Sequence, residues 1–592
     1  SAPNYGAGQV ILNNNGGTAA FTYNTITGNT SSNTDASSLY LEGDGRFQYN
    51  NIHSNGATYE VYLGNDNSKP PLDATNNYWG TTDASVIKEE IYDFEDDLTR
   101  GRINFSPLLG STYTTPILGP ANPTITITGQ SGTPADPIFT LALSAATTPT
   151  QMLISDDPTF PVQFTWEPFA PTKEFHSDGT KYIYARFKDA SNNESAIAFT
   201  RPSSVIGGII STDTVWGLSG SPYTVTQNVL VDMDAILTIE PGVEVRFAAG
   251  KALQVNGGLV ARGTSAAPIV FTSAAANPAP GDWVYIFFSD SSVDAVLDPT
   301  DNYVSGSILE HCEVRYGGGT GSIGAVQLDK ASPLIDHCTI RDSATAGLRM
   351  NSSWGGAQVR NSHIINNQQD GVSINVGTVI FANDVISGNG GIGFNISNYA
   401  GGNTTIVTST IENNANAGIS VYNAYGTINF SDNTIRGNGR GGISVNGGGY
   451  SSNQIIARNV IENNTNTSGG GCWECGQAGG LSITGDYIQY TIQDNQILNN
   501  RGIQGGGFYL NYGRPLPGSV ISGNVIRNNQ ATSNSGGVYF YIDTRENKSL
   551  TIQNTTISGN SAPNYGAGQV ILNNNGGTAA FTYNTITGNT SS

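Results

Sequence analysis

The chain has 592 residues, of which 12% are charged and 74 are glycine, and its formal net charge is −20. This charge disfavours a nucleic-acid partner, because a phosphate backbone is bound by clustered lysine and arginine. The sequence has no run of ~18 apolar residues, so it predicts no membrane span. Low charge, abundant Asn and Thr, and the lack of a cofactor motif favour an extracellular or cell-surface protein.

Residues 1–108 contain a short phrase of the type Asn-x-Ile-x-x-Asn, once at Asn24–Asn29 and again at Asn50–Asn55. We call the isoleucine of each phrase its anchor, here Ile26 and Ile52. Near the end of this segment lies an acidic stretch whose carboxylates could bind calcium or form a solvated surface. The calcium candidates are Asp93, Glu95, Asp96 and Asp97.

Residues 112–203 break this pattern and predict a small, separate β domain. Pro116, Pro120 and Pro123 indicate a linker at its start. Alternating apolar residues at 124–128, 138–143 and 182–187 predict strands. About 90 residues of short strands fit a β-sandwich.

Residues 207–592 contain the same phrase at intervals of 22 to 36 residues. The anchors are Val314, Ile340, Ile364, Ile386, Ile411, Ile435, Ile461, Ile497, Ile526 and Ile557. Three residues after most anchors lies an asparagine, which tolerates left-handed backbone and can stack into a hydrogen-bonded ladder. The predicted ladder is Asn367, Asn389, Asn414, Asn438, Asn464, Asn500, Asn529, Asn560, Asn29 and Asn55.

Five successive coils then have a glycine seven residues after the anchor, followed by an alternating apolar segment such as Gly442–Val445. Each repeat therefore reads as short strands separated by Asn and Gly turns. One such coil cannot bury its apolar face alone, so stacking must supply the core. The pattern predicts an all-β chain: a parallel β-helix solenoid interrupted by the small sandwich.

These coils resemble right-handed parallel β-helix proteins of the pectate-lyase-like superfamily. The stretches 237–242, 243–247 and 268–272 are similar to the segment that opens such a helix, and residues 76–108 are similar to the one that closes it. The stretch 178–189 resembles immunoglobulin-like modules of bacterial surface proteins. The resemblance implies a helix over residues 207–592 and 1–108, with an Ig-like module between them.

Residues 561–592 repeat residues 1–32 without a difference. The repeated sequence begins within a coil, and opening-type sequence at 207 follows closing-type sequence at 76–108. The simplest interpretation is a tandem array with a 560-residue unit. A circularly permuted or engineered chain with an overlapping end is the alternative.

Cysteine and histidine recur at coil spacing. Cys312 and Cys338 lie two residues before successive anchors, where they could form a disulfide or remain buried thiols. His311, His337 and His363 are 26 residues apart, so the sequence predicts turn histidines or, less simply, a stacked metal site. Cys472 and Cys475 form a CxxC pair, for which a local disulfide is expected.

The anchor-to-glycine distance lengthens after Ile461, Ile497 and Ile526. Insertions at one turn of adjacent coils often mark a binding face, so this edge is a candidate contact for a glycan, a neighbouring fibre or the sandwich. The binding candidates are Trp473, Glu474, Asn464 and Asn500.

The superfamily includes polysaccharide lyases and hydrolases, so the resemblance implies that acidic side chains could act as catalysts. Asp342, Asp370, Glu412, Glu462 and Asp494 are scattered over different coils without a consistent triad. We therefore predict no enzyme and no cofactor beyond calcium. The predicted role is a subunit of an extracellular filament that binds copies of itself. The alternatives are an adhesin for glycans or other surface proteins, and a polysaccharide lyase or hydrolase.

Overall fold

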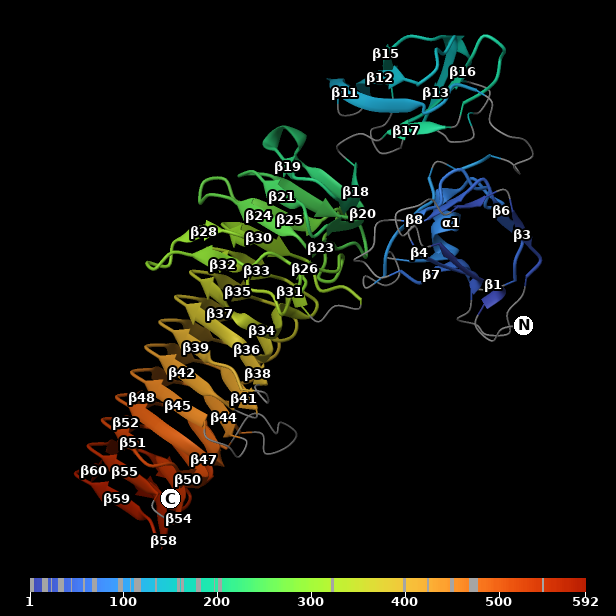
Figure 1. The fold of residues 1–592 in the computed structure, drawn as a ribbon. Coiled ribbons are helices and arrows are strands. Elements are labelled where there is room, and N and C mark those ends of the chain that lie inside the picture. Colours follow the sequence, from blue (N-terminus) through green and yellow to red (C-terminus); the bar gives the residue numbers. More distant parts are fainter. Residues whose placement is uncertain are drawn as a thin grey trace. The chain divides into compact units, whose positions relative to one another are not determined.

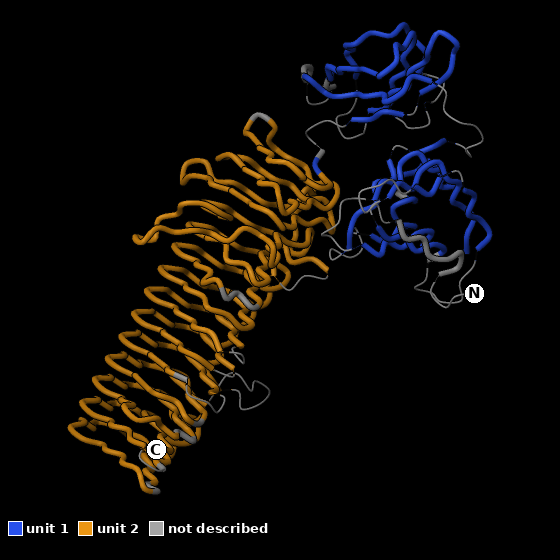
Figure 2. The backbone as a smooth tube through the Cα atoms, in the orientation of Figure 1, with its two compact units in different colours: residues 1–206 blue, residues 207–592 orange. Residues whose placement is uncertain are grey.

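The computed structural model divides the chain into two compact units, residues 1–206 and residues 207–592, which are described separately (Figure 2). The structure describes residues 5–12, 20–22, 24–29, 37–43, 45–56, 59–65, 72–93, 100–106, 108–110, 119–133, 136–156, 160, 164–176, 183–195, 197–200, 205–320, 324–397, 401–422, 425–447, 452–467, 477–545 and 548–591.

The first part of unit 1 is a short stack of coils whose parallel strands form three columns. One column is β1 (Tyr5–Leu12), β4 (Ser37–Gly43), β7 (Tyr59–Leu63) and β9 (Ile91–Tyr92). The second is β2 (Ala20–Thr22), β5 (Arg46–Gln48), β8 (Leu72–Asp73) and β10 (Ile103–Asn104). The third pairs β3 (Thr25–Thr27) with β6 (Asn51–His53). Helix α1 (Ala84–Glu89) lies near the end of this stack in the sequence.

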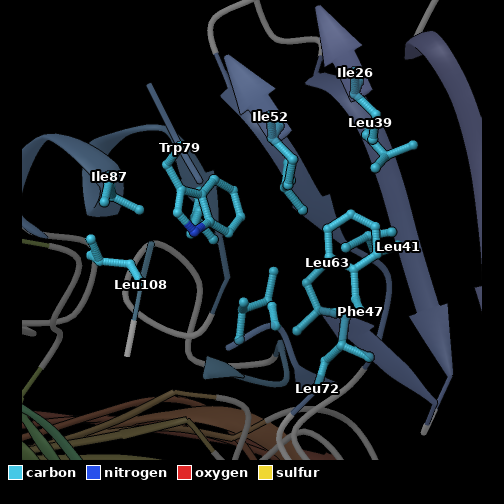
Figure 3. Close-up of a cluster of buried hydrophobic side chains, with 14 residues drawn as sticks. Ile26, Leu39, Leu41, Phe47, Ile52, Leu63, Leu72, Trp79, Ile87 and Leu108 are labelled. Carbon is cyan, nitrogen blue, oxygen red and sulfur yellow. The ribbon is translucent and has the colours of Figure 1, made fainter. Parts of the chain in front are cut away.

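The interior of these coils is apolar because strand residues alternate between inward and outward positions. Figure 3 shows Ile26, Ile52, Phe47 and Trp79 among the buried side chains of this core. Phe21 and Phe47 stack with ring centroids 5.2 Å apart, as expected for equivalent residues on successive coils.

The second part of unit 1 has two antiparallel sheets around one core. One sheet contains β11 (Thr124–Thr133), β12 (Asp136–Ser144) and β15 (Thr172–His176). The other contains β14 (Glu167–Pro168), β13 (Gln151–Ser155), β16 (Ile183–Lys188) and β17 (Ala198–Thr200). Both sheets contribute to the core, for example through Phe139 and Phe187. These strands contain the predicted stretches 124–128 and 138–143, and β16 contains residues 183–187 of the third, whose first residue lies outside the described residues.

Unit 2 is a long parallel β-helix, whose coils follow one another from green to red in Figure 1. It opens with β18 (Val205–Ile210), β19 (Thr214–Trp216), the short 3₁₀ helix Leu218–Gly220 and β20 (Tyr223–Val231). The first half of β20 starts the column of anchor strands and its second half starts another column.

The anchor column continues through short strands whose inward residues are buried from Val245 to Ile557. Its members are β22 (Glu244–Phe247), β25 (Ile269–Ser273), β30 (Cys312–Arg315), β33 (Thr339–Arg341), β35 (His363–Ile365), β37 (Val385–Ser387), β40 (Thr410–Glu412), β43 (Thr434–Arg436), β46 (Val460–Glu462), β48 (Gln496–Leu498), β52 (Val525–Arg527), β56 (Thr556–Ser558) and β60 (Thr585–Thr587). All ten predicted anchors from Val314 to Ile557 lie in this column and are at most 1% exposed. The structure extends the column back to Phe271 and Val245.

Two further columns flank the anchor column. The column before it contains β21 (Ile236–Ile239), β24 (Gly258–Arg262), β29 (Ile308–Glu310), β32 (Leu334–Asp336), β39 (Thr404–Val407), β42 (Thr427–Ser431), β45 (Ser452–Ala457), β51 (Ser519–Ser522), β55 (Ser549–Gln553) and β59 (Thr578–Thr582). The column after it contains β23 (Leu253–Val255), β26 (Ile286–Phe288), β31 (Gly324–Asp329), β38 (Phe394–Ser397), β41 (Ile419–Tyr422), β44 (Ile443–Gly447), β50 (Phe508–Pro515), β54 (Val538–Arg545) and β58 (Gly568–Asn575). The long strands β34 (Ala346–Arg360), β36 (Val372–Ala382) and β47 (Leu481–Gln493) take part in both.

Two smaller sheets complete unit 2. A hairpin of β27 (Val296–Leu297) and β28 (Tyr303–Ser305) is inserted in the coil between Phe271 and Val314 of the anchor column. The lengthened turns of the last coils form their own parallel sheet of β49 (Arg501–Gln504), β53 (Gln530–Asn534), β57 (Ser561–Ala562) and β61 (Thr590–Ser591). These insertions were expected to project from the edge, but in the described residues from 501 onward they stack as an additional column. Within the described part of the chain, no helix is long and apolar enough to cross a membrane.

Candidate functional site

The asparagines three residues after the anchors form a buried hydrogen-bonded ladder along the β-helix. In Asn414, the backbone N–H and the side-chain Nδ2 both donate to Oδ1 of Asn438, at 3.1 and 3.0 Å. Nδ2 also donates to the carbonyl oxygen of Ile386, the anchor of the preceding coil, at 3.1 Å. The same bonds recur from Asn367 to Asn560, and these residues are at most 1% exposed. The ladder therefore links three successive coils at every level.

The backbone conformation predicted for these asparagines was wrong by one residue. The left-handed backbone belongs to the residue before each ladder asparagine, such as Asn413 with φ 55° and Asn463 with φ 56°. Glycine takes the same place at Gly388 and Gly437. The left-handed residue makes the turn, and the turn aims the following asparagine into the interior.

A second ladder, which the sequence analysis missed, lies two residues before the anchors. Asn433 donates from N and Nδ2 to Oδ1 of Asn459, both at 3.0 Å, and Nδ2 also donates to the carbonyl of Ile406 at 2.8 Å. The signal was the first asparagine of the Asn-x-Ile-x-x-Asn phrase. Other coils fill the slot with different polar residues, which obscured the pattern. The slot holds Cys312, Cys338, Ser362, Asp384, Ser409, Asn433, Asn459, Asn495, Asn524, Thr555 and Asn584.

The recurring glycine after each anchor is explained by close approach to the first ladder. A Cβ on Gly418 would lie 2.8 Å from Asn438 Nδ2 and 2.8 Å from the carbonyl oxygen of Gly442. The methyl group of Ile435 would be equally close. Any larger residue would displace the ladder asparagine of the next coil, so the glycine and the asparagine are parts of one packing arrangement.

In unit 1 the first ladder ends on a carboxylate. Asn29 donates to Oδ1 of Asn55 from both N and Nδ2 at 2.9 Å. Asn55 in turn donates to Glu60, from N to Oε1 at 3.2 Å and from Nδ2 to Oε2 at 2.5 Å. Each ladder asparagine directs its backbone N–H and one N–H of its side-chain amide toward the next coil, so the row ends in donors that favour a negative group. Glu60 is 6% exposed and supplies that group.

Burial around this carboxylate also affects a neighbour. Burial, reinforced by the charge of Glu60, raises the pKa of Glu90 above its ordinary value. The backbone N–H of Glu60 donates to the carbonyl oxygen of Glu90 at 2.7 Å, which holds the two residues together.

The described residues of the repeated 32-residue sequence contribute parallel strands to a coil in both of its locations. In unit 2, Ile586 pairs with Ile557 of the preceding coil, and Asn560 N donates to Asn589 Oδ1 at 2.9 Å. In unit 1, the equivalent Ile26 pairs with Ile52 of the following coil. One copy thus shows what stacks on the N-terminal side of this coil, and the other shows what stacks on its C-terminal side.

Superposing the two copies in sequence makes all the columns continuous. The first ladder runs Asn529, Asn560, Asn589 (equivalent to Asn29), Asn55 and Glu60. The second runs Thr555, Asn584 (equivalent to Asn24), Asn50 and Asn77. The third aligns Ile552 with Phe581, equivalent to Phe21, and then Phe47. These three rows need no shift in register.

The anchor of the repeated coil is exposed to a different extent in its two copies, because the coil that covers it is present only in unit 1. Ile26 is 8% exposed because Ile52 covers it, whereas Ile586 is 53% exposed. Tyr583, at the left-handed turn of the same coil, is 85% exposed.

A cluster of charged residues around Asp336 lies on the early coils of unit 2. Asp336 accepts hydrogen bonds from Arg360 Nε at 2.8 Å and from Asn361 Nδ2 at 2.9 Å. His337 Nδ1 lies 2.7 Å from the same carboxylate. Arg360 also donates to the carbonyl oxygen of Asp301 at 2.7 Å, which attaches the β27–β28 hairpin to the coils. These contacts satisfy Asp336 and give the cluster a structural role.

The three histidines do not form one stack. His311 and His337 both occupy left-handed turn positions, with ring centroids 4.7 Å apart. His363 lies instead in strand β35 opposite Thr339, and Asn361 takes the turn position. The equal spacing of the three histidines does not place them in one stack, because the coil from Ile340 to Ile364 is shorter than the coil from Val314 to Ile340. Among the described residues, no group of three or more His, Cys, Asp or Glu could hold a metal ion.

The cysteine and calcium candidates are only partly described. Cys312 and Cys338 are free and buried, so in this structure they are thiols rather than a disulfide. Asp93 accepts a hydrogen bond from the backbone N–H of Ile103 at 2.8 Å and is 5% exposed. Outside the described residues lie Glu95, Asp96, Asp97, Cys472, Trp473, Glu474 and Cys475. Asn464 and Asn500, proposed for the binding edge, are buried ladder members and cannot contact a ligand from that edge.

Three of the scattered acids of the central coils, Asp342, Asp370 and Glu412, have hydrogen-bonding or ion-pair partners. Glu412 accepts from Arg436 Nε at 2.6 Å on the next coil, and Asp370 accepts from the backbone N–H of Ile392 at 2.7 Å. The side chain of Asp342 pairs with Arg341. The bonds of Glu412 and Asp370 join neighbouring coils, whereas Asp342 pairs with the residue before it in the chain, and none of these bonds brings two carboxylates together.

Comparisons with known proteins agree with the fold. Residues 296–452 and 346–541 match the family model described as a right handed beta helix region, and residues 208–321 match a pectate-lyase like beta helix domain. The Protein bark beetle of Drosophila melanogaster is 45% identical over 67 residues, which are 11% of this chain. That match spans only 2% of the length of the curated relative.

Solved structures are more distant. The periplasmic alginate epimerase AlgG is 13% identical, with a TM-score of 0.34 over 64% of this chain and 85% of that chain. A mutant of AlgG gives 14% identity and a TM-score of 0.38 over the same shares. No property of the epimerase is transferred to this chain at that similarity. The paired columns and the two family models identify the chain as a right-handed parallel β-helix protein.

Proposed function

We propose that this protein is the repeating unit of an extracellular or cell-surface structural rod. In the proposed array, a β-helix and the small antiparallel domain of residues 124–200 alternate with a period of 560 residues. The observation that carries the proposal is the 32-residue coil that occurs twice. Its two copies supply complementary neighbours, so units 2 and 1 read as the two halves of one β-helix.

The continuity of the hydrogen bonds supports this order. Asn560 donates to Asn589 in one copy, and the equivalent Asn29 donates to Asn55 in the other. A ladder that is broken at a coil would leave buried amide groups without partners, which costs about 1–3 kcal/mol for each group. The joined order avoids that loss, and the ladder then ends at Glu60, next to the closing segment of the helix.

The joined helix is long and narrow. The anchor column has fourteen levels in unit 2, from Tyr223 to Ile586, and unit 1 adds two levels beyond the repeated coil. At ~4.8 Å per level, sixteen levels give a rod of roughly 70 Å. Each coil contacts only its neighbours, so the length can grow by adding units without changing the core. This geometry suits a spacer or fibre.

The side-chain chemistry supports a structural rather than a catalytic role. Carboxylates of the described coils bind arginine or backbone N–H groups of adjacent coils, as Glu412 and Asp370 do. The ladders use amide groups whose hydrogen bonds are already filled. A structural rod uses such contacts directly, whereas glycoside hydrolysis needs two carboxylates converging on one bond.

Limited proteolysis of the protein isolated from its source tests the array. In a partial digest, a protease that cuts in the linker near residues 111–118 should release a series of fragments whose lengths differ by one 560-residue unit. Each fragment should keep the circular dichroism signal of β-sheet. Negative-stain electron microscopy should show rods joined by small domains. If no fragment longer than one unit is seen at any stage of the digestion, the proposal is contradicted. A glycan array on the same preparation separates an inert fibre from an adhesin.

A further inference from the structure

Two cysteines occupy the second ladder on successive coils of unit 2. Ile269 pairs with Cys312, and the neighbouring Val314 pairs with Ile340, which places Cys312 level with Cys338. Both side chains are 2% exposed and point into the core. Equivalent residues on parallel neighbouring strands lie ~4.8 Å apart, within the Cα separation of ~4.4–6.8 Å that disulfides span.

We propose that Cys312 and Cys338 form a disulfide that joins these two coils covalently. The proposal uses the extracellular location argued above, since disulfides persist in oxidising compartments, but it does not depend on the tandem arrangement. The bond would make one rung of the second ladder covalent.

With free thiols, the second ladder connects these two coils more weakly than it connects coils that have asparagine at this position. At an amide rung, Asn433 makes two hydrogen bonds to Asn459 on the next coil. Cys338 Sγ instead lies 3.2 and 3.3 Å from the carbonyl oxygens of Leu309 and Asp336, and Cys312 Sγ lies 3.4 Å from that of Glu310. Thiols are weak donors and weak acceptors, so they replace the amide link poorly. A disulfide restores a strong connection between the coils at the same position.

The reaction is a thiol–disulfide exchange with a small-molecule disulfide such as oxidised glutathione. One cysteine thiolate attacks the small disulfide, forms a mixed disulfide and releases one small thiolate. The second cysteine thiolate attacks the cysteine sulfur of that mixed disulfide and releases the other. The two cysteines lose two protons and two electrons in total, and the small disulfide becomes two thiols.

The bond should form while the coils assemble rather than afterwards. Burial, together with the neighbouring Cys338, raises the pKa of the Cys312 thiol well above its ordinary value. The attacking species is the thiolate, so the closed coil reacts slowly. Oxidant present during folding is therefore required, and a protein folded under reducing conditions should retain both thiols.

Peptide mapping of the full chain tests the disulfide. The protein is refolded in a glutathione redox buffer, then denatured without reductant, alkylated and cut with trypsin. The segments 263–315 and 331–341 each contain one cysteine and no internal Lys or Arg, so they are the expected cross-linked pair. The pair should separate after reduction, and reduction should lower the thermal unfolding midpoint of unit 2 by several degrees.

A second variant keeps the assignment unambiguous. The double substitution Cys472→Ser and Cys475→Ser removes the remaining cysteines and should leave the cross-linked pair unchanged. In Cys312→Ser, Cys338 should carry the alkyl label, and reduction should no longer change the unfolding midpoint. Full alkylation of both Cys312 and Cys338 in the oxidatively refolded protein would overturn the proposal. A cross-link from either cysteine to Cys472 or Cys475 would overturn it equally.

Discussion

Asp384 is a carboxylate in a ladder position that several other coils fill with asparagine. Its Oδ1 accepts the backbone N–H of Ser362 at 2.8 Å, and its own N–H donates to Ser409 Oγ at 3.0 Å. The residue is 1% exposed, and Oδ2 has no hydrogen-bond partner among the described residues. Burial raises the pKa of Asp384 from 3.8 to about 8, and the charge of Asp336 adds to the increase. The folded protein therefore holds this carboxyl protonated at neutral pH.

A raised carboxyl pKa lowers stability as pH rises. Below pH ~4 the group is protonated in both folded and unfolded chains, and it carries no ionisation penalty. Between that pH and about 8 only the unfolded chain ionises, so the free energy of unfolding falls with pH and levels off above the folded pKa. Each pKa unit corresponds to about 1.4 kcal/mol, so at pH 7 the penalty is about 4 kcal/mol. Asp384→Asn should recover most of that free energy at pH 7 and little at pH 4.

Native-state hydrogen exchange with mass spectrometry measures this effect locally, which suits a chain whose separate cores need not unfold together. Peptides covering residues 372–412 should exchange more slowly in Asp384→Asn than in the wild type at pH 7, and alike near pH 4 after correction for intrinsic rates. Asn433→Asp is the matched control, because it puts a carboxyl into the equivalent slot and removes the donors to Ile406 and Asn459. It should destabilise its own coils more at pH 7 than at pH 4. A gain in Asp384→Asn that is absent, or equal at both pH values, would refute this reasoning.

Three substitutions test the ladders with the same assay. Asn438→Ala removes the acceptor of Asn414 and should lower local stability by about 3 kcal/mol, while the exposed Arg436→Ala should change it by less than about 1 kcal/mol. Gly418→Ala forces a Cβ against the ladder and should cost about 1–3 kcal/mol; no measurable loss would show that the coil spacing is not set by this contact. Glu60→Ala should destabilise the coils around Asn55 by about 1–3 kcal/mol and lower the pKa of Glu90, whereas Glu60→Gln should keep an acceptor and lose less. An unchanged Glu90 titration in Glu60→Ala would contradict the coupling of these carboxylates.

The parts of the fold that could be predicted are those that repeat with one residue type. From Val314 to Ile557 every anchor is a buried isoleucine or valine, so the spacing was visible over these coils. The ladder asparagine and the glycine that contacts it recur together, because a Cβ at the glycine position would collide with the asparagine side chain. The strands predicted at 124–128 and 138–143 form a hairpin in the structure.

The parts that could not be predicted depend on slots that accept several chemistries or on shifts in length. The second ladder is filled by Cys, Ser, Thr, Asp and Asn, since each can take part in a bond between coils. His363 keeps the interval of 26 residues, yet it leaves the turn position because the coil from Ile340 to Ile364 has only 24. The buried state of Asn464 and Asn500 excludes them from the binding edge, and only the direction of the side chains reveals this.

The central claim is that residues 561–592 and 1–32 are the same coil of one continuous β-helix in a repeated chain. The most direct measurement is the nucleotide sequence on both sides of the segment that encodes these 592 residues. In a tandem array, codons for the sequence of residues 33–108 follow Ser592, and codons for the sequence ending at Asn560 precede Ser1. A stop codon or unrelated sequence immediately after Ser592 would contradict it.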